Sequence, residues 1–227
     1  MANFVLVAGT FHGGWYWDSV TSELLNNGHS VYAPTLSGLD GEIQTRAINL
    51  DTHISDVVEL IEANSISDVI LVGWSYGGMV ITGVADKVRE KVKKLIYLDG
   101  QLPKSGEREW DLMPAHDRES TLAKSVDGLN IFPDEWLKNY EPRTHPHPLG
   151  TKLQPIHYDQ DKFDVIPKVF IYAEKWFHDP SVTSPIKRSF ELASKSRGWH
   201  VQSWPYGHDL VRECKEKVIA LLLQEVN

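Results

Sequence analysis

The sequence of 227 residues lacks several features that would assign it to common classes of protein. It has a single cysteine, Cys214, and can therefore form neither an internal disulfide nor a cysteine-based metal site. No apolar run approaches the roughly 20 residues needed to cross a bilayer. The short apolar run at residues 4–7 follows no basic segment, so we predict no export signal.

Positive charge is also scarce, because 23 Lys and Arg residues stand against 31 Asp and Glu, a formal net charge of −8. Such an acidic balance argues against a nucleic-acid or anionic-membrane partner. The hydrophobic content of 41% and charged content of 24% are typical of a globular protein. We therefore predict one soluble, cytoplasmic domain. The oligomeric state stays open, with a homodimer as one option.

Short apolar runs alternate with helical patterns along much of the chain. Between two such runs, Ile54, Val57, Val58 and Ile61 repeat at the spacing of one helical face. Repeated strand–helix–strand units predict an α/β fold with a mostly parallel central sheet and helices on both faces. The predicted strands cover residues 4–7, 30–33, 69–72, 94–98, 169–172 and 200–204.

The alternation stops between about residues 106 and 162. This stretch is rich in charged residues, proline, histidine and large aromatic side chains, and it has no strand–helix rhythm. We interpret it as a cap inserted above the sheet. The core then comprises about residues 1–105 and 163–227.

A candidate nucleophile lies in the segment GWSYG, Gly73–Gly77, which fits the pattern G-x-S-x-G. The pattern gains specificity here because it follows an apolar strand and opens a helix. A sharp turn at this point would lift the Ser75 hydroxyl above the sheet. It would also leave the amide of Tyr76 free at the helix N-terminus, as one donor of an oxyanion hole.

A serine hydroxyl needs a base to take its proton, and His208 is the best placed of the ten histidines. It follows the last predicted strand and precedes the last helix, in the chain order serine, acid, histidine. His145 and His147 could be taken for a metal pair, but no third ligand follows at a suggestive spacing. We therefore predict no metal and no cofactor.

Three carboxylates near strand ends could orient this histidine. Asp179 is the first choice, because it opens a loop that leads into a helix beside the last strand. Asp99 ends the strand at residues 94–98 and is a rival. Glu174, which ends the strand at residues 169–172, comes third.

The loop after the first strand, AGTFHGG at residues 8–14, should supply the second oxyanion donor. The amide of Thr10 is the natural candidate, with Phe11 next. Among the aromatic residues, Trp74 and Trp110 are candidate pocket walls together with Phe11.

Taken together, these segments resemble the α/β-hydrolase superfamily. The opening FVLVAGTFHGGWYW at residues 4–17 resembles plant methyl esterases, hydroxynitrile lyases and bacterial pyrethroid-hydrolase-like carboxylesterases. The segments YLDGQLP at 97–103 and RTHPHPL at 143–149, with the later GWHV at 198–201 and GHD at 207–209, are similar to the bacterial esterases. The likeness extends over nearly the whole chain.

The resemblance implies Ser75 as nucleophile, His208 as base and Asp179 as acid. It also implies backbone oxyanion donors at Thr10 and Tyr76, and a cap over an apolar pocket. Two departures stand out. Ala8 replaces the family's usual histidine, and the loop leading to Asp179 is longer than usual, so that Asp99 and Glu174 stay open.

We predict a cofactor-independent serine hydrolase that cleaves a small carboxylic ester. One alternative is a carbon–carbon lyase of the hydroxynitrile type, which Asp209 opposes because such lyases carry a lysine after the catalytic histidine. The other alternative is a non-catalytic binder of a small ligand on the same fold. The complete set of serine, histidine and acid argues against it.

Overall fold

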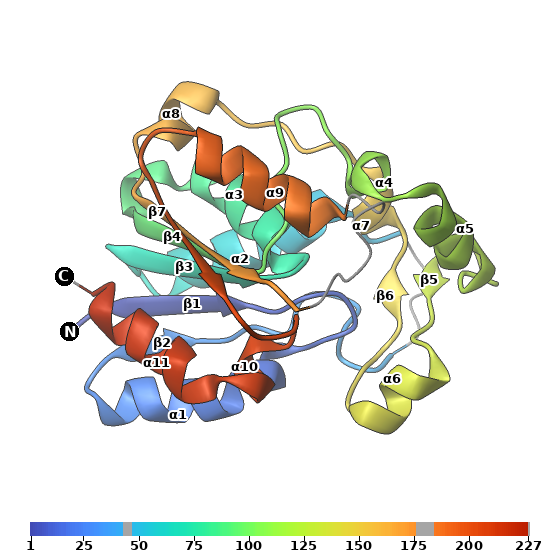
Figure 1. Cartoon of the computed structure of the whole chain (residues 1–227), viewed down its shortest axis with the longest axis horizontal. Coiled ribbons are helices and arrows are strands. Elements are labelled where there is room, and N and C mark those ends of the chain that lie inside the picture. The colour runs from blue at the N-terminus through green and yellow to red at the C-terminus, as the bar shows by residue number, and fades with distance from the viewer. Residues whose placement is uncertain (43–46, 176–183, 227) are drawn as a thin grey trace.

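The computed structural model describes residues 1–42, 47–175 and 184–226. Within them, six strands form one sheet in the order β2-β1-β3-β4-β7-β8, with every neighbouring pair parallel (Figure 1). The predicted α/β fold with a mostly parallel sheet is therefore confirmed. The strands are β1 (Asn3–Val7), β2 (Ser30–Tyr32), β3 (Val69–Trp74), β4 (Val92–Leu98), β7 (Lys168–Ala173) and β8 (Trp199–Trp204).

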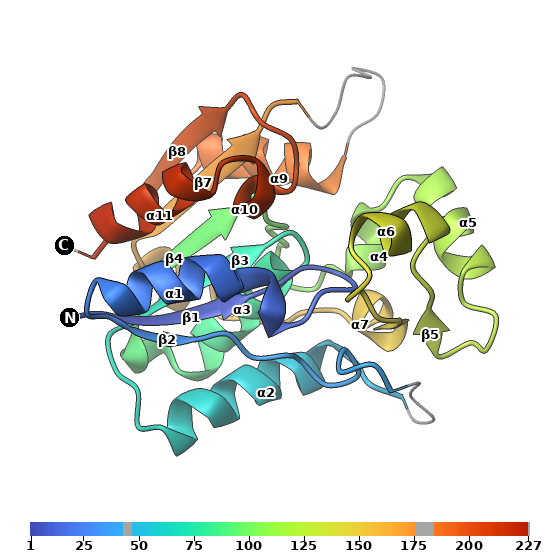
Figure 2. The ribbon, with the colours of Figure 1, turned by 90° about the horizontal axis from the view of Figure 1, so that it is seen from below.

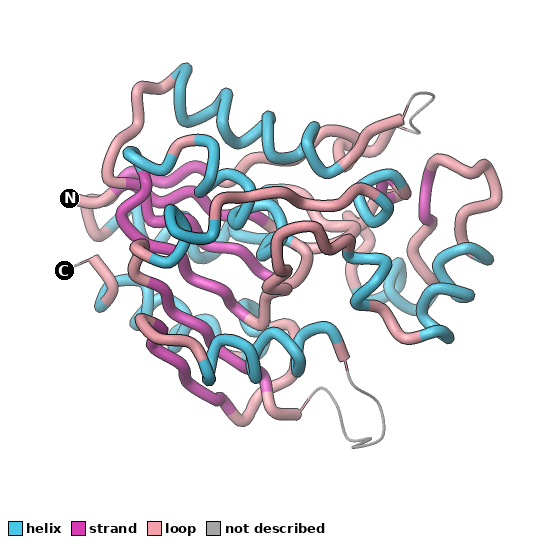
Figure 3. The backbone as a smooth tube through the Cα atoms, turned by 90° about the horizontal axis from the view of Figure 1, so that it is seen from above, coloured by secondary structure: helices cyan, strands magenta, loops and turns pink. Residues whose placement is uncertain are grey.

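Helices cover both faces of the sheet, as the views from opposite sides show (Figures 2 and 3). Alternate residues of each strand serve the two layers: Val5 and Val7 pack with one apolar cluster, and Phe4 and Leu6 with the other. The first layer contains α2 (Leu50–Ala63), α3 (Gly77–Lys87), α8 (Gln160–Asp164) and α9 (Pro185–Lys195). The second contains α1 (Asp18–Asn26), α10 (Leu210–Glu213) and α11 (Lys215–Gln224).

Local sequence signals account for where these helices begin. The side chain of Asn49 accepts the amide of Thr52 at the start of α2, and that of Ser184 accepts the amide of Lys187 at the start of α9. The predicted apolar face of α2 packs inward, because Ile54, Val57 and Ile61 are buried. No helix in the described parts of the chain is long and apolar enough to span a membrane.

Between β4 and β7, residues 109–153 form short elements beyond the carboxyl ends of the strands, on the side opposite the two termini, whereas α8 lies against the sheet (Figure 1). The chain on either side of these short elements is joined, because Gly106 donates its amide to the carbonyl of Ile156 (2.6 Å) and Ile156 donates to that of Glu107 (2.9 Å). Besides α8, the elements of this stretch are α4 (Glu109–Leu112), α5 (Ala115–Ala123), α6 (Glu135–Tyr140), α7 (Gly150–Leu153) and the paired strands β5 (Asn130–Ile131) and β6 (His147–Pro148).

Candidate active site

Ser75 lies in a tight turn between β3 and α3, with a backbone φ of 54° that side chains other than glycine rarely adopt. The surrounding glycines are required by contact. A Cβ on Gly73 would lie 2.6 Å from the carbonyl oxygen of Gly77, and one on Gly77 would lie 2.4 Å from that of Val7. A Cβ on Gly9 would approach the Cβ of Ser75 to 2.8 Å. The pattern G-x-S-x-G therefore marks a strained turn that raises Ser75 above the sheet.

A methyl group at position 77 should be costly, because it would meet backbone that has little freedom to move. We expect Gly77→Ala to lower the free energy of unfolding by about 3 kcal/mol, the upper range for overpacking a closed site. The matched control is Gly28→Ala. The φ of Gly28, 79°, is strained for alanine, but a Cβ at this position meets nothing within 4 Å. The free energy of unfolding should therefore fall by only about 1 kcal/mol. If urea denaturation shows that Gly77→Ala and Gly28→Ala lower the free energy of unfolding equally, this steric explanation is wrong.

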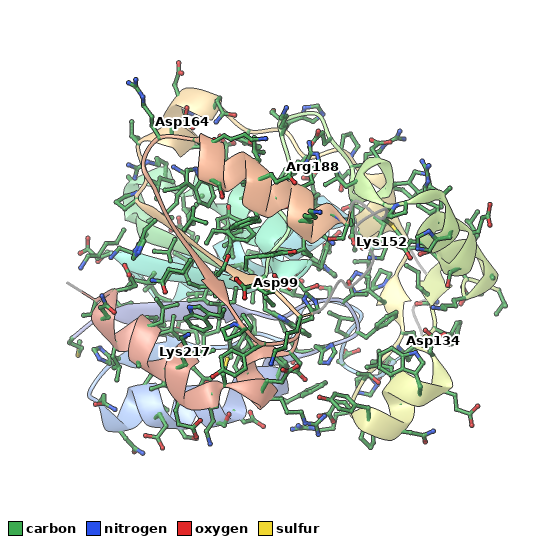
Figure 4. The ribbon with its side chains drawn as sticks, viewed as in Figure 1. Asp99, Asp134, Lys152, Asp164, Arg188 and Lys217 are labelled. Atoms are coloured by element: carbon green, nitrogen blue, oxygen red, sulfur yellow. The ribbon has the colours of Figure 1, made fainter. Side chains whose placement is uncertain are left out.

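His208 follows β8 and meets Asp99 at the end of β4. The Nδ1 atom of His208 lies 2.6 Å from Oδ2 of Asp99, which is fully buried. The other oxygen of Asp99 accepts the amide of Ala173 at 2.9 Å, and the indole of Trp74 donates to the carbonyl of His208 at 2.8 Å. The carboxylate is thus fixed at the centre of the sheet's carboxyl edge, where Figure 4 labels it. This is the arrangement that orients a catalytic imidazole.

The structure describes one of the other two predicted acids. Asp179 lies outside the described residues. Glu174 is exposed, and its backbone amide donates to the carbonyl of Trp204. Asp99 can reach His208 because β4 and β8 both border β7, and the Asp99 amide donates across to Ile171 of β7 at 2.7 Å.

The loop after β1 is held by hydrogen bonds to three successive carbonyls. The ring of His12 donates from Nδ1 to the carbonyl of Thr10 (2.8 Å), and its amide donates to that of Gly9. The amide of His145 donates to the carbonyl of Phe11, whose φ is 70°. Burial lowers the pKa of His12, so the ring is neutral at pH 7. His12 thus supports the loop in which Ala8 replaces the family's usual histidine.

A cavity of about 660 Å³ opens above Ser75. Thr10, Phe11, Trp74 and His208 line it together with Ser75. The structure thus brings the predicted nucleophile, base, oxyanion loop and two of the three predicted aromatic walls to one space. The third predicted wall residue, Trp110, does not line the cavity. Its side chain is half-buried on α4.

Tyr76 has separate roles for its backbone and its side chain. Its amide stands just before the first residue of α3, whereas its hydroxyl is buried 3.0 Å from Nδ1 of His53. The ring of His147 packs edge-on against Tyr76, and its Nε2 lies 2.9 Å from Oγ1 of Thr151. In the described parts of the chain, no group of three or more His, Cys, Asp or Glu side chains could hold a metal.

His53 should make the fold sensitive to acid. Burial lowers its pKa to about 4, against about 6.5 in the unfolded chain. Below pH 6.5 the unfolded state takes up a proton that the folded state refuses, so stability is full above this pH and falls toward pH 4. His53 alone should lower the free energy of unfolding by about 2 kcal/mol when the pH falls from 7 to 5.

The variant His53→Gln can still bond the hydroxyl of Tyr76 and the carbonyl of Ser37, which the imidazole now contacts. We expect it to remove about 2 kcal/mol of the pH dependence, measured by urea unfolding at pH 7 and pH 5. Part of the dependence should remain, because burial also lowers the pKa of His147. The nearby carboxylate of Asp56 raises the pKa of His53, opposing the effect of burial, and this carboxylate is unchanged in the variant. An unaltered dependence in the variant would contradict the assignment.

Three polar residues near the cavity were not predicted from the sequence. Gln101 and Glu109 line it, and Lys152 pairs with Glu109 at 2.7 Å. Gln101 comes just after the end of β4, a position at which functional side chains gather. No pattern links Glu109 to Lys152, because 42 residues separate them in the irregular stretch.

The parallel sheet, the strained serine turn and the histidine–carboxylate pair define an α/β hydrolase. Residues 4–220 match the family described as the alpha/beta hydrolase family, and the chain belongs to this family. It is 35% identical over 249 residues to a carbendazim hydrolyzing esterase from Nocardioides sp. (strain SG-4G), covering 97% of this chain and 100% of that protein.

Two solved structures share the fold. One is described as an extracellular α/β-hydrolase from a Paenibacillus species, with homology to tobacco salicylic acid binding protein 2. It has a TM-score of 0.84 and 23% identity, over 99% of this chain and 98% of that chain. The other, a pyrethroid hydrolase from Sphingobium faniae JZ-2, has a TM-score of 0.78 and 20% identity, over 98% and 96%. The resemblance inferred from the sequence is confirmed.

Proposed function

We propose that this α/β hydrolase cleaves small carboxylic esters through an acyl-enzyme formed on Ser75. The observation that carries the proposal is the convergence of Ser75 with the His208–Asp99 pair on one cavity. The similarity to an esterase over the full length of both chains supports the reaction class. Asp99 is the acid in this proposal, in place of Asp179, because its carboxylate contacts Nδ1 of His208.

The reaction has two halves. Ser75 attacks the ester carbonyl while Nε2 of His208 takes the hydroxyl proton, and the Asp99 carboxylate stabilises the imidazolium. The amides of Tyr76 and Thr10 stabilise the tetrahedral oxyanion. His208 then gives its proton to the departing alcohol. Water attacks the acyl-enzyme by the same route and restores Ser75.

Asp209 disfavours a lyase that must hold a departing cyanide. This carboxylate lines the cavity directly after His208, and it accepts the hydroxyls of Tyr16 (3.1 Å) and Tyr140 (3.3 Å). A fixed negative charge repels an anionic leaving group. A non-catalytic binder would have no use for the strained turn and the oriented imidazole.

We further propose that residues 106–162 form a cap on a single domain and that the protein acts in the cytoplasm on small molecules. The hydrogen bonds that join residues 106–107 to Ile156, and the place of residues 109–153 beyond the strand ends, support the first point. The single cysteine, Cys214, which is buried and free, is compatible with a reducing compartment. The substrate enters as a small molecule, since the cavity has about 660 Å³.

The test follows p-nitrophenol release from short-chain acyl esters in the first moments of the reaction. A burst equal to the enzyme concentration, with an acyl adduct on Ser75 detected by mass spectrometry, is the expected result. Turnover without an adduct would refute the covalent route. Incubation with mandelonitrile should release no cyanide above the level of a protein-free blank, and rapid cyanide release would favour the lyase.

A further inference from the structure

The helix α6 forms part of the cavity wall although apolar burial does not anchor it. Trp136, Leu137 and Tyr140 line the cavity, yet no residue of α6 is buried, and the exposed fractions of Trp136 and Tyr140 are 66% and 46%. Within the described parts of the chain, neither apolar cluster of the sheet contains a residue from positions 107–155. Because apolar burial is the main force that fixes an element in place, α6 depends on other contacts for its position.

These contacts involve Tyr140, the last residue of α6. The Tyr140 hydroxyl donates to Oδ2 of Asp209 (3.3 Å), and Nη1 of Arg212 donates to the Tyr140 carbonyl (3.2 Å). The Arg212 guanidinium also lies 4.0 Å from the centroid of the Tyr140 ring. We name Tyr140, Asp209 and Arg212 the Tyr140 latch. Among the described residues, the hydrogen bonds and ring contacts between α6 and the core all belong to this latch.

The core side of the latch is fixed by its own partners. Asp209 caps the start of α10, where its side chain accepts the amide of Arg212, and its Oδ1 accepts the Tyr16 hydroxyl (3.1 Å). The ring of Tyr16 stacks on that of Trp74 at 4.1 Å, and the Trp74 indole donates to the carbonyl of His208. Asp209 and Arg212 therefore hold Tyr140 from a part of the core that does not depend on the cap.

The rest of α6 is attached only within the cap. Asp134, just before the helix, pairs with Lys124 after α5 at 2.7 Å. Beyond the helix, the Arg143 guanidinium lies 4.3 Å from the centroid of Trp15, and the amide of His145 donates to the loop after β1. These later contacts hold the base from which α6 extends. The latch then fixes the direction of the helix, which lies opposite α10 in Figures 1 and 2.

Arg212 acts from outside the cavity. It is exposed and is not among the described residues that line the cavity, whereas Asp209 and Tyr140 are. Loss of its guanidinium would delete two of the three latch contacts and leave the side chains of the cavity wall unchanged. Any effect on substrate binding must then come through the position of α6. Because a cavity of about 660 Å³ is larger than a small ester, α6 supplies contact to a long apolar chain rather than a size limit.

We propose that Arg212 is a positioning residue that sets the affinity for esters with a long apolar chain, because it holds α6 against the cavity through the Tyr140 latch. This deepens the proposed function and rests on it for the reaction. The position of α6, however, is a property of the fold and can be measured without turnover. A short ester that does not reach α6 should be insensitive to the latch.

Hydrogen–deuterium exchange of residues 135–141 tests the latch itself. Arg212→Met keeps an apolar stem without the guanidinium, and it should speed exchange of these amides about tenfold by local opening. The matched control is Lys217→Met, because Lys217 is also an exposed cation, 4.4 Å from the centroid of Trp204. This pair belongs to α11 and β8, and neither residue is among the described residues lining the cavity. The control should leave exchange in α6 unchanged. Unchanged exchange in Arg212→Met, or equal effects in the two variants, would overturn the proposal.

Kinetics with two esters test the consequence for binding. In Arg212→Met, we expect kcat/KM for p-nitrophenyl octanoate to fall about tenfold, the scale of lost contact with roughly two methylene groups. The fall should lie in KM, with kcat within about twofold of the wild type, because the reacting groups are untouched. For p-nitrophenyl acetate, kcat/KM should change by less than about twofold. Arg212→Lys keeps a cation beside the Tyr140 ring and should restore most of the affinity for the octanoate.

An equal fall in kcat/KM for both esters, or a fall that lies in kcat, would overturn the role of Arg212 in substrate binding. Failure of the esterase proposal gives a different result. In that case the wild-type protein cleaves neither ester, while hydrogen exchange in Arg212→Met and Lys217→Met still decides whether the latch holds α6.

Discussion

Ser75→Ala should reduce kcat for p-nitrophenyl butyrate by about 10⁵- to 10⁶-fold, the scale on which nucleophile knockouts act in serine hydrolases. The loss is large because the covalent route disappears entirely, while the oxyanion donors and the cavity remain. Binding of a small competitive ligand should persist, since Ser75 is one residue among many that line the cavity. Steady-state kinetics and calorimetry on the same preparation separate the two effects.

The chain provides a matched control for this substitution. Ser65 also has a left-handed backbone, with a φ of 51°, but it is exposed in the turn between α2 and β3. Ser65→Ala should share any strain that alanine feels in this conformation and leave turnover intact. If Ser75→Ala keeps more than a tenth of the wild-type rate, or if Ser65→Ala loses as much, Ser75 is not the nucleophile.

Asp99→Asn should lower kcat by about 10⁴-fold with little change in shape. The amide side chain can donate to Nδ1 of His208, which favours the imidazole tautomer that cannot take the serine proton. The Asn oxygen can still accept the amide of Ala173, as Oδ1 of Asp99 does at 2.9 Å. Circular dichroism should therefore be unchanged while kcat/KM falls.

The variant to compare with Asp99→Asn is Asp179→Asn, because the sequence favours Asp179 as the acid. With Asp99 as the acid, we expect the activity of Asp179→Asn to stay within tenfold of the wild type. The reverse result, collapse of Asp179→Asn with activity retained in Asp99→Asn, would transfer the role to Asp179. Both variants are measured at one pH with the same ester, so that the tautomer argument applies equally to each.

The core could be predicted from the sequence because its signals are local. The four inner strands β1, β3, β4 and β7 contain short apolar runs that are buried, and the face of α2 repeats at helical spacing. The edge strands β2 and β8 are only partly buried. The cap segment offers no such signal. Its strands have two residues each and α4 has four, too short for any periodicity to develop.

The site residues also fall into those that a local sequence pattern predicts and those that depend on three-dimensional contacts. Ser75 and His208 are marked by position, since a strained turn needs glycines and the base follows the last strand. The choice of Asp99 over Asp179 depends on which carboxylate contacts Nδ1 of His208, and spacing along the chain does not specify that contact. The pairing of Glu109 with Lys152 depends on how the cap folds back on itself.

The paired hydrogen bonds between residues 106–107 and Ile156 have an evolutionary consequence. They bring the two ends of residues 107–155 together, so this stretch can be exchanged as a cassette without pulling on the strands beneath it. Ser75, Asp99 and His208 all lie outside the cassette, whereas Glu109 and Lys152 lie inside it. Exchange of the cassette would therefore change which ester is recognised and leave Ser75, Asp99 and His208 in place, provided that the new cassette also supplies the amide that His145 donates to the loop after β1. Substrate range can therefore change through residues 107–155, while the residues outside this stretch keep the chemistry of ester cleavage.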